Sequence, residues 1–255
     1  MQKTIVITGA AGGLGVATTR ALQKAGHRVI GADLQGADEK LNVTDPEACR
    51  ILARRLMPDV WINNAGVLGS GQAADQPDAE IRRVVEVNLL GLMWGSRAAI
   101  EVMRPRGSGH LINIGSLSSW ITPLGQAAYS ASKHGVRAFT VGLAAELEGS
   151  GLDISLVCPD GIWTPMLFDQ LENASAAMSF TTPKLLTPDA VAAIIADLIE
   201  KPRLHVVIPS VRGFGARLVG LLPNVNVVMT RMLAARGRKV QAQMLSERPK
   251  VESPR

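Results

Sequence analysis

Short apolar segments alternate with longer amphipathic segments along most of the chain. Apolar runs without strict alternation predict strands buried on both faces, as in a parallel sheet. Such runs occupy residues 5–8, 28–33, 60–63, 109–115, 154–158 and 205–208. Between them, helical spacing of the apolar positions predicts helices over residues 16–25, 78–103, 131–148 and 188–200. Thr187 is in place to cap the last of these helices.

This alternation predicts an α/β fold in which a doubly wound parallel sheet binds its ligand at the carboxyl ends of the strands. We assign residues 1–210 to one domain of this kind and residues 211–246 to a C-terminal amphipathic helical extension of the same domain. Residues 247–255, which alternate in charge and contain two prolines, are predicted to be a disordered tail. Only eight residues separate Asp33 from Asn42, so we expect a loop rather than a helix between the second and third strands.

A glycine-rich turn connects the first predicted strand to the first predicted helix. Glycine lets the backbone approach a pyrophosphate closely, and a helix N-terminus offers free N–H groups and a partial positive charge. A tight turn without a ligand is the alternative, but the position of this turn after the first strand favours a dinucleotide site. The candidate binding residues are Gly9, Ala11, Gly12, Gly13, Leu14 and Gly15.

Asp33 ends the second predicted strand. A carboxylate at this place accepts hydrogen bonds from the adenosine ribose and repels a 2′-phosphate, which favours NAD over NADP. Leu34 follows it, and no lysine or arginine lies in the glycine-rich turn. Both features also argue against a phosphorylated ribose. The alternative is an ordinary loop aspartate.

Tyr129 and Lys133 are four residues apart on a predicted helix, and Ser116 lies thirteen positions before the tyrosine. Residues at this spacing share one helix face, so both side chains can reach one ligand. A nearby ammonium group favours the phenolate and lowers the pKa of a tyrosine, which can then exchange a proton with an alcohol or carbonyl. The serine hydroxyl can stabilise charge on the substrate oxygen. Taken alone, the pair is a weak signal, because two exposed residues on a helix face are the commoner explanation.

Composition sets limits on the class of protein. The chain has 255 residues, 47% of them hydrophobic, which is enough for a substantial core. The net charge of +5 comes largely from basic residues near the C-terminus, and no zinc spacing or aromatic RNA-binding motif accompanies them, so we expect no nucleic-acid partner. The two cysteines form no Cys-x-x-Cys pair, so neither a metal site nor a disulfide is indicated. With no secretory signal and no long apolar stretch, a cytoplasmic location is expected.

Five features in a fixed order resemble the short-chain dehydrogenase/reductase family over roughly residues 3 to 210. They are Thr8-Gly-x-x-x-Gly-x-Gly15, Asn63-Asn-Ala-Gly66, Asn88, Ser116 and Tyr129-x-x-x-Lys133. The resemblance implies a single-domain Rossmann fold and hydride transfer between a nicotinamide cofactor and an alcohol or carbonyl. It also suggests a homodimer or homotetramer formed through the helices over 78–103 and 131–148.

The resemblance also implies roles for individual residues. Tyr129 would be the acid/base, Ser116 would orient the substrate oxygen, and Lys133 would bind the nicotinamide ribose and lower the pKa of the tyrosine. Asn88 would bend its helix and hold a water of the proton relay through its backbone. The remaining cofactor contacts would come from Asn42, Val43, Asn64, Ala65, Gly66, Pro159, Ile162 and Thr164.

Two positions depart from the family pattern. Asn42 stands where the family usually has aspartate, although an amide carbonyl can still accept the adenine amino hydrogen. Asp160 stands where the family has glycine after Pro159. This carboxylate could help to bind an oxidised, cationic nicotinamide or could point to solvent, and we favour solvent.

The residues expected around the substrate are bulky and apolar, and no lysine or arginine lies among them before Lys184. Such a lining suits a small lipophilic substrate. The alternative is that these side chains only pack a lid onto the core. They are Trp120, Ile121, Leu124, Trp163, Met166, Leu167, Phe168, Met178 and Phe180.

The C-terminal extension combines apolar faces with arginines. Basic amphipathic helices of this kind can lie on an anionic membrane surface, pack over the substrate mouth or contact another subunit. The pattern does not choose among these three.

The sequence therefore predicts an NAD-dependent dehydrogenase that acts on a lipophilic secondary alcohol, steroid-like or fatty. One alternative is an NADPH-dependent carbonyl, 3-oxoacyl or enoyl reductase that works in the opposite direction. The other is a non-catalytic nucleotide-binding protein. The complete set of Asn88, Ser116, Tyr129 and Lys133 argues against the second alternative.

Overall fold

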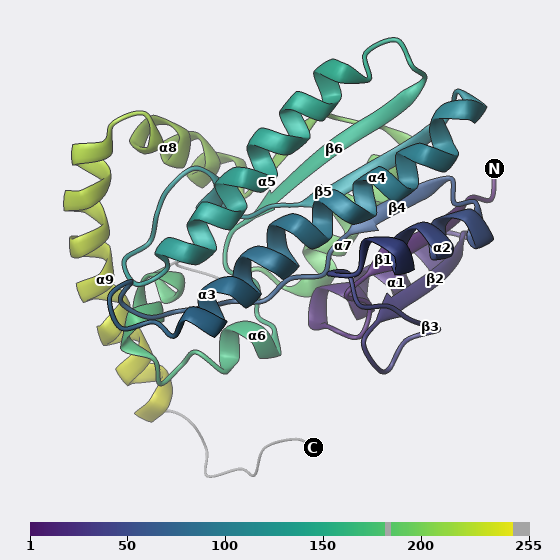
Figure 1. Cartoon of the computed structure of the whole chain (residues 1–255). Coiled ribbons are helices and arrows are strands. Elements are labelled where there is room, and N and C mark those ends of the chain that lie inside the picture. Colours follow the sequence, from purple (N-terminus) through teal and green to yellow (C-terminus); the bar gives the residue numbers. More distant parts are fainter. Residues whose placement is uncertain (182–184, 247–255) are drawn as a thin grey trace.

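A computed structural model of the chain describes residues 1–181 and 185–246. Its centre is a parallel sheet with the strand order β3-β2-β1-β4-β5-β6-β7 (Figure 1). This arrangement confirms the predicted α/β doubly wound fold. The strands are β1 (Thr4–Thr8), β2 (Arg28–Asp33), β3 (Glu39–Lys40), β4 (Val60–Asn63), β5 (Gly109–Ile114), β6 (Leu152–Pro159) and β7 (His205–Ile208).

Helices cover both faces of the sheet. On one face α1 packs against α7, and on the other α2 packs against α4 and α3 against α5. Two large apolar clusters, one on each face, contain the core, with Ile7 and Ile195 in the first and Trp61 and Leu111 in the second. The helices are α1 (Gly13–Lys24), α2 (Pro46–Leu56), α3 (Asp78–Val85), α4 (Leu92–Met103), α5 (Ala127–Glu146), α6 (Pro165–Phe168), α7 (Pro188–Glu200), α8 (Ser210–Gly220) and α9 (Pro223–Ser246).

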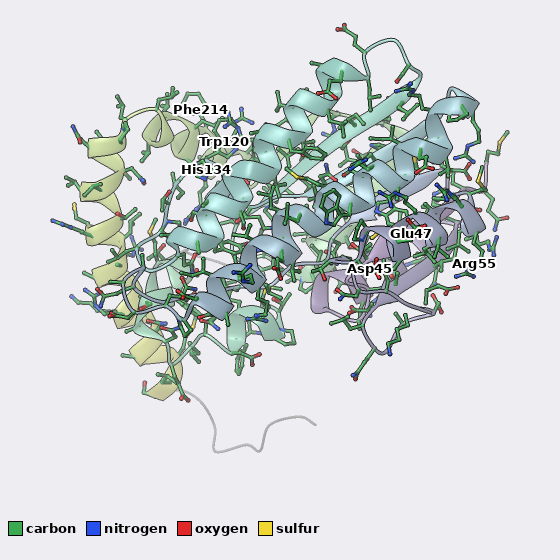
Figure 2. The ribbon with its side chains drawn as sticks, in the orientation of Figure 1. Asp45, Glu47, Arg55, Trp120, His134 and Phe214 are labelled. Carbon is green, nitrogen blue, oxygen red and sulfur yellow. The ribbon has the colours of Figure 1, made fainter. Side chains whose placement is uncertain are left out.

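Helix α2 was not predicted, although its local signals are present in the sequence. The Asp45 side chain accepts hydrogen bonds from the backbone N–H groups of Glu47 and Ala48, and Pro46 occupies the first turn. Arg55 lies near the other end of this helix (Figure 2) and pairs with Glu39 of β3 at 2.6 Å. The helix therefore connects β3 to β4 and fixes the edge of the sheet.

The connection between β2 and β3 is a short loop, as expected. Five residues cannot carry a helical crossover, so the two strands pair only at Ala32 with Glu39 and at Asp33 with Lys40. The strand itself lies before Asn42, and Asn42 and Val43 are left in the loop that follows.

The helix predicted over residues 78–103 is interrupted. A π-helical segment, Glu86–Gly91, separates α3 from α4. A π-helical turn inside an α-helix often marks a functional site. Two other helices begin earlier than predicted, α1 at Gly13 and α5 at Ala127, so Tyr129 lies in the first turn of α5.

The C-terminal extension consists of α8 and α9, which lie at the end of the molecule opposite β2 and β3 (Figure 1). The second half of α9 packs on the 3₁₀ segment Ala174–Phe180, where Val240 and Met244 contact the cluster around Phe180. The predicted tail, residues 247–255, lies outside the described part of the chain. None of the described helices combines the length and apolar character that a membrane crossing needs. Cys49 and Cys158 are both buried and free.

Candidate active site

A cavity of about 610 Å³ opens at the carboxyl ends of the strands. Every residue expected to bind the cofactor lines it, from the glycine-rich turn to Thr164, and so does Ser116. Asn88 does not line the cavity but lies just behind it. The predicted residues, which are spread over 156 positions of sequence from Gly9 to Thr164, are therefore brought to one place in the fold.

The glycine-rich turn is held closely against the start of the loop after β4. Gly9 has φ +67°, and a Cβ added there would lie 2.6 Å from Ala65 Cα. A Cβ on Gly15 would lie 2.2 Å from the Gly9 carbonyl oxygen. A side chain at either position would collide with nearby backbone atoms, so only glycine fits there. A Cβ on Gly13 would meet Thr164 at 2.9 Å, which places that threonine directly over the turn.

Asn64 ties this turn to the loop after β4. Its side-chain amide donates to the carbonyl oxygens of Thr8 and Gly9, at 3.0 Å each. The Thr8 hydroxyl in return accepts the backbone N–H groups of Asn64 and Ala65, each at 3.1 Å. This reciprocal pairing keeps two separate loops rigid around the cradle that would hold a pyrophosphate.

The Asp33 carboxylate lies at the end of β2, beside the glycine-rich turn. Its Oδ2 accepts the backbone N–H of Ala11 at 2.9 Å and its Oδ1 accepts that of Leu34 at 2.7 Å. Each carboxylate oxygen keeps a second acceptor position. The cradle and this carboxylate fit the pyrophosphate and ribose of a dinucleotide.

Asn42 does not present its carbonyl oxygen in the way we expected. Its Oδ1 accepts the backbone N–H of Thr44 at 3.1 Å and the Thr44 hydroxyl at 2.9 Å, which forms a local turn. The two acceptor positions of that oxygen are thus engaged, while the amide nitrogen has no protein partner among the described residues. Val43 next to it also lines the cavity.

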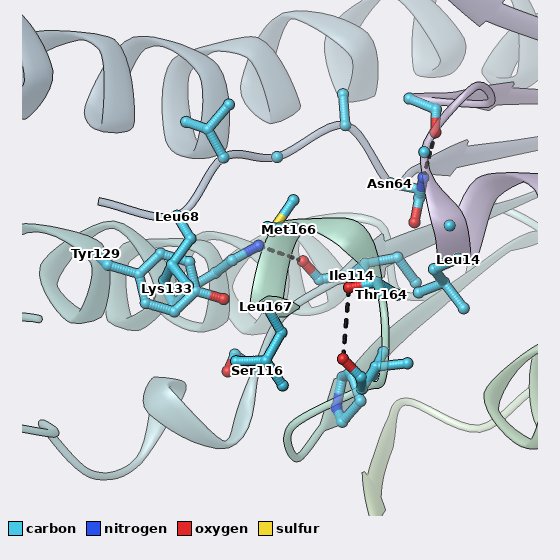
Figure 3. A pocket seen from close by; sticks show the side chains of 18 of the residues that line it. Leu14, Asn64, Leu68, Ile114, Ser116, Tyr129, Lys133, Thr164, Met166 and Leu167 are labelled. Atoms are coloured by element: carbon cyan, nitrogen blue, oxygen red, sulfur yellow. Dashed lines mark hydrogen bonds between the residues drawn. The ribbon is translucent and has the colours of Figure 1, made fainter. Parts of the chain in front are cut away.

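Tyr129 and Lys133 both project from α5 into the cavity, with Ser116 facing them from the end of β5 (Figure 3). The Lys133 ammonium lies 5.9 Å from the centre of the Tyr129 ring and donates to the Ile114 carbonyl oxygen at 2.9 Å. Burial lowers the pKa of Lys133 to about 8. A lysine with this pKa gains and loses its proton near neutral pH more easily than a surface lysine.

The pKa of Tyr129 is raised, which is opposite to the expected effect of Lys133. Burial raises the pKa most, and a hydrogen bond with Ser116 lowers it only in part. The expected depression is therefore absent in the protein by itself, because removal of the hydroxyl from water outweighs the hydrogen bond with Ser116. Tyr129 is half-buried and faces the cavity, so a bound cofactor changes this environment.

Ser116 and Asn88 are each held by backbone groups. The Ser116 hydroxyl oxygen accepts the N–H of Ser118 at 3.1 Å, which fixes its direction. The Asn88 side chain accepts the Val67 N–H at 2.7 Å and donates to the Val67 carbonyl oxygen at 2.9 Å. These bonds attach the π-helical segment to the loop after β4.

Asp160 does not point to solvent, so our preferred expectation for it was wrong. Its Oδ2 lies 2.7 Å from Nε of Arg212, its side chain is only 12% exposed, and its Oδ1 accepts the N–H of Gly161. The reason is tertiary: the chain leaves β7 and enters α8, which brings Arg212 over the loop after β6. Sequence reasoning could not place a residue of the C-terminal extension here.

The apolar residues predicted around the substrate divide into two groups. Ile121, Met166, Leu167 and Met178 line the cavity. The others do not: Trp120 lies under the guanidinium of Arg137 at 3.6 Å, Trp163 packs edge-on against Phe168, and Leu124 and Phe180 lie outside the lining. Lys184 lies outside the described residues.

Several lining residues were missed by sequence reasoning. Arg212 and Arg83 add positive charge, and Gln126 donates to the Ser179 hydroxyl at 2.8 Å. The sequence search stopped at Lys184 and therefore found no cation near the substrate. No local pattern marks Arg212, because its place depends on the packing of α8.

Comparison with known proteins gives the family. The family model described as short chain dehydrogenase matches residues 39–175, which is more than half of the chain. Momilactone A synthase of Oryza sativa subsp. japonica is 34% identical over 217 residues, covering 76% of this chain and 74% of the relative. D-beta-hydroxybutyrate dehydrogenase of Rhizobium meliloti is 29% identical over 210 residues, covering 73% and 81%.

Solved structures agree with these sequence relatives. Levodione reductase superposes with a TM-score of 0.73 at 25% identity, covering 83% of this chain and 97% of that one. A variant of actinorhodin polyketide ketoreductase with NADPH gives 0.73 at 27% identity, covering 81% and 95%. Fold, site geometry and sequence similarity agree, and the chain belongs to the short-chain dehydrogenase/reductase family of nicotinamide-dependent oxidoreductases.

Proposed function

We propose that the protein oxidises a lipophilic secondary alcohol to a ketone with NAD as the hydride acceptor. The observation that carries this proposal is the convergence of Ser116, Tyr129 and Lys133 on the cavity that also contains the glycine-rich turn and Asp33. A binding protein would need the turn and the carboxylate but not a positioned acid/base. An oxidoreductase needs both.

Tyr129 acts as the base in this reaction. Its hydroxyl lies opposite Ser116, so a substrate hydroxyl placed between them donates its proton to the tyrosine while Ser116 steadies the oxygen. Lys133 stays on the Ile114 carbonyl and holds its positive charge beside the ring. The oxidised cofactor supplies the hydride acceptor, and its positive charge favours the phenolate form of Tyr129.

Asp33 supports NAD over NADP. Its two oxygens are oriented by Ala11 and Leu34 at the place where a ribose would lie. The lining on this side of the cavity continues with Leu34, Leu41, Asn42 and Val43, none of which is a cation. A 2′-phosphate beside Asp33 would therefore meet a carboxylate and no cation among these four neighbours.

The substrate side supports a lipophilic molecule with a polar end. Ile121, Met166, Leu167 and Met178 form an apolar wall, while the Asp160–Arg212 pair supplies a polar group that is neutral overall. A relative from Streptomyces exfoliatus, 36% identical over 190 residues, is named 1-deoxy-11-beta-hydroxypentalenate dehydrogenase. That name describes a hydroxyl on a carbon skeleton that also carries an acid.

A screen of NAD reduction over steroids, fatty secondary alcohols, hydroxy acids, sugars and small diols tests the substrate class. We expect turnover with the first two groups and little with sugars or diols, and at least tenfold higher kcat/KM with NAD than with NADP. Preference for polar substrates or for NADP would contradict the corresponding part of the proposal. Tyr129→Phe should remove nearly all turnover while NADH binding is retained.

Tyr129 is the only tyrosine of the chain, which allows a direct test of its role. The near-ultraviolet absorbance of tyrosinate reports the ionisation of this one residue. We expect an apparent pKa above the ordinary value in the protein alone, because burial raises it, and a fall when NAD binds. No change on NAD binding would contradict the proposed coupling. Lys133→Met should reduce the fall and leave the protein folded.

The second candidate is reduction of a carbonyl, such as a 3-oxoacyl group, with NADPH. Its support is the similarity to the ketoreductase whose structure is titled with NADPH. The same residues would serve, with Tyr129 as the acid. Faster turnover of ketones with NADPH than of alcohols with NAD would favour this function. Binding of either cofactor with no turnover of any alcohol or ketone would leave a non-catalytic nucleotide-binding protein.

We also propose a cytoplasmic homodimer or homotetramer that forms through α3, α4 and α5. Val141 of α5 is 47% exposed, and Trp94 of α4 lies under the guanidinium of Arg97, 5.7 Å from its ring centre. Sedimentation equilibrium of the full chain tests the subunit number, and Val141→Glu should lower it.

A further inference from the structure

We propose that the outer face of α8 and the first half of α9 binds an anionic lipid surface. This face is defined by the exposed apolar residues Val211, Phe214, Leu218, Leu221, Leu222, Val225, Val228, Met229 and Met232, and it is called the apolar stripe below. The proposal goes beyond the proposed reaction and does not depend on it.

The apolar stripe is regular. On α8, Val211, Phe214 and Leu218 follow helical spacing and are 83%, 65% and 50% exposed. Phe214 stands on the outer side of that helix (Figure 2). On α9, Val225, Val228 and Met232 continue the pattern at 40%, 60% and 69% exposure. Helices of a globular protein normally turn such a face toward the core, and an apolar patch of this extent marks an interaction surface.

The packing of α8 prevents the stripe from turning inward. The inner side of the helix carries small residues, Gly213, Ala216 and Gly220. A Cβ on Gly213 would lie 2.4 Å from the Val207 side chain. One on Gly220 would lie 2.2 Å from the Trp120 carbonyl oxygen. Leucine or phenylalanine cannot occupy these contacts, so the rotation that exposes the large side chains is fixed.

The second half of α9 is anchored in a similar way. A Cβ on Gly237 would lie 1.9 Å from the Ala177 carbonyl oxygen, and the Gln241 amide donates to the carbonyl oxygens of Gln170 and Asn173. The helix is therefore held at its C-terminal half, and its first half carries the exposed stripe. Outward-facing apolar side chains are thus a consequence of fixed contacts at both ends.

The charges around the apolar stripe indicate what binds to it. No aspartate or glutamate occurs from residue 201 to residue 246, whereas this stretch contains eight lysines and arginines. Arg236 and Lys239 follow Met232 at helical spacing and continue the stripe, and Arg231 and Arg238 flank it, all four exposed. These four cations form no ion pair within residues 1–181 and 185–246, and an apolar band next to such cations suits lipid chains and anionic headgroups.

A second copy of this chain fits the same face less well. A symmetric dimer would place the stripe against itself and would bring the two sets of basic residues together with no acidic residue between them. Like charges brought together cost free energy, whereas anionic lipid headgroups neutralise them. Neither α8 nor α9 combines the length and the apolar character that a bilayer span needs, so the contact would lie in the interface plane.

The surface adjoins the cavity. Arg212, in the first turn of α8, lines the cavity, while Val211 and Phe214 of the same helix face outward. A membrane under α8 would therefore lie within one helix diameter of the substrate site. This position would allow a lipophilic substrate to pass from lipid to enzyme, a consequence that does rest on the proposed function.

Sedimentation of the full chain with vesicles tests the proposal. One set is phosphatidylcholine alone, and the other contains phosphatidylcholine with a third of phosphatidylserine. We expect binding to the anionic vesicles at least tenfold stronger than to the neutral ones, and weakened by salt. Failure to bind anionic vesicles, or equal binding to both sets, would overturn the proposal.

Two variants test the residues. The first replaces Val211, Phe214 and Leu218 by serine, and the second replaces Arg231, Arg236, Arg238 and Lys239 by glutamine. Each basic residue near an anionic surface strengthens binding about fivefold, so the second variant should lose at least a hundredfold on anionic vesicles. The first should lose binding to both vesicle sets by at least tenfold.

Control variants carry changes of the same kind elsewhere, two apolar residues to serine and four basic residues to glutamine. Ile51→Ser with Leu204→Ser alters exposed apolar residues, and glutamine at Lys24, Arg28, Lys40 and Arg104 alters exposed basic residues. Thermal unfolding shows that each variant is folded. Equal losses in the controls would overturn the assignment. The proposal would also fail if the wild-type chain self-associated without binding vesicles and the serine variant abolished that self-association. The face would then be an interface with a second copy of the chain.

Discussion

Gly15 in the glycine-rich turn and Gly220 at the end of α8 meet the same local constraint. At each position an added Cβ would lie 2.2 Å from a backbone carbonyl oxygen, that of Gly9 in one case and of Trp120 in the other. The surroundings differ, however. Gly15 is buried near the start of α1, which packs against α7, whereas Gly220 belongs to α8 at the edge of the molecule (Figure 1).

Because the surroundings of Gly15 and Gly220 differ, the two close contacts have different consequences. Around Gly15 the backbone has nowhere to move, so the contact supports the fold and shapes the proposed cofactor cradle. Around Gly220 the helix can shift outward, so the contact sets which face of α8 points to solvent. The same close approach therefore serves binding in one region and orientation in the other.

The largest predicted effect comes from Gly15→Ala. We expect a loss of more than about 3 kcal/mol in the free energy of unfolding, together with loss of NADH binding, because the clash is with rigid backbone. Urea unfolding and NADH fluorescence titration measure the two effects. Gly142→Ala is the matched control: this glycine is exposed on helix α5 with open space around it, and the change should stabilise by about 0.5 to 1 kcal/mol. Retained NADH binding in Gly15→Ala would contradict the cradle assignment.

The next effect concerns two histidines, His110 in β5 inside the sheet and His205 in β7 beside α8. Burial within the sheet lowers the pKa of His110 to about 4, while burial and the nearby Arg217 lower that of His205 to about 4. Because His110 in the unfolded chain titrates near 6.5, its neutral form contributes stability above that pH, and this contribution is lost as the pH falls from about 6.5 to 4. At full extent it reaches about 3 kcal/mol for His110.

Urea unfolding at pH 7 and at pH 4.5 measures this loss. His110→Gln should flatten the pH dependence clearly, since His110 is 3% exposed and hydrogen-bonded to Ser155 at 2.9 Å. His205→Gln should flatten it less, because His205 is only half-buried. An equal effect of the two variants would show that the inner and outer regions are equally well packed.

A moderate effect is expected for the Asp160–Arg212 pair, which joins the two regions. Asp160→Ala should destabilise the protein by about 2 kcal/mol, because Arg212 would be left partly buried without its partner. The double variant with Arg212→Ala should recover part of this loss. A double-mutant cycle by thermal unfolding gives the coupling, and a coupling near zero would mean that the pair only fills space. In Asp160→Ala, the KM for the alcohol should rise by a larger factor than the kcat falls.

The smallest effect is expected for Gly220→Ala. We predict a loss of about 1 kcal/mol or less, because α8 can move away from Trp120. Hydrogen exchange should show faster opening of α8 but unchanged protection of β1. Gly215→Ala on the same helix has open space and serves as the control. A loss as large as that of Gly15→Ala would remove the distinction between the two regions.

Much of the fold and site could be read from local pattern. Buried parallel strands leave apolar runs, so six of the seven described strands were predicted, and only the two-residue β3 escaped because it has no run of its own. Helix α2 was missed although Asp45 and Pro46 mark its start. The glycine-rich turn, Asp33 and the Tyr129–Lys133 spacing were recognisable because each chemical requirement acts within one short segment.

Other properties arise only when distant segments meet. The pKa of Tyr129 depends on burial, not on the spacing to Lys133, so its direction could not be predicted from the helix alone. Asp160 pairs with Arg212 because β7 leads into α8 beside the loop after β6. Helix α8 turns its apolar side outward because Gly213 and Gly220 meet β7 and Trp120. The sequence by itself determined the chemistry and the cofactor cradle, which need only local spacing. The tertiary structure alone decided the charge at the substrate end and the face that α8 exposes, because burial and long-range contact are set by the whole chain.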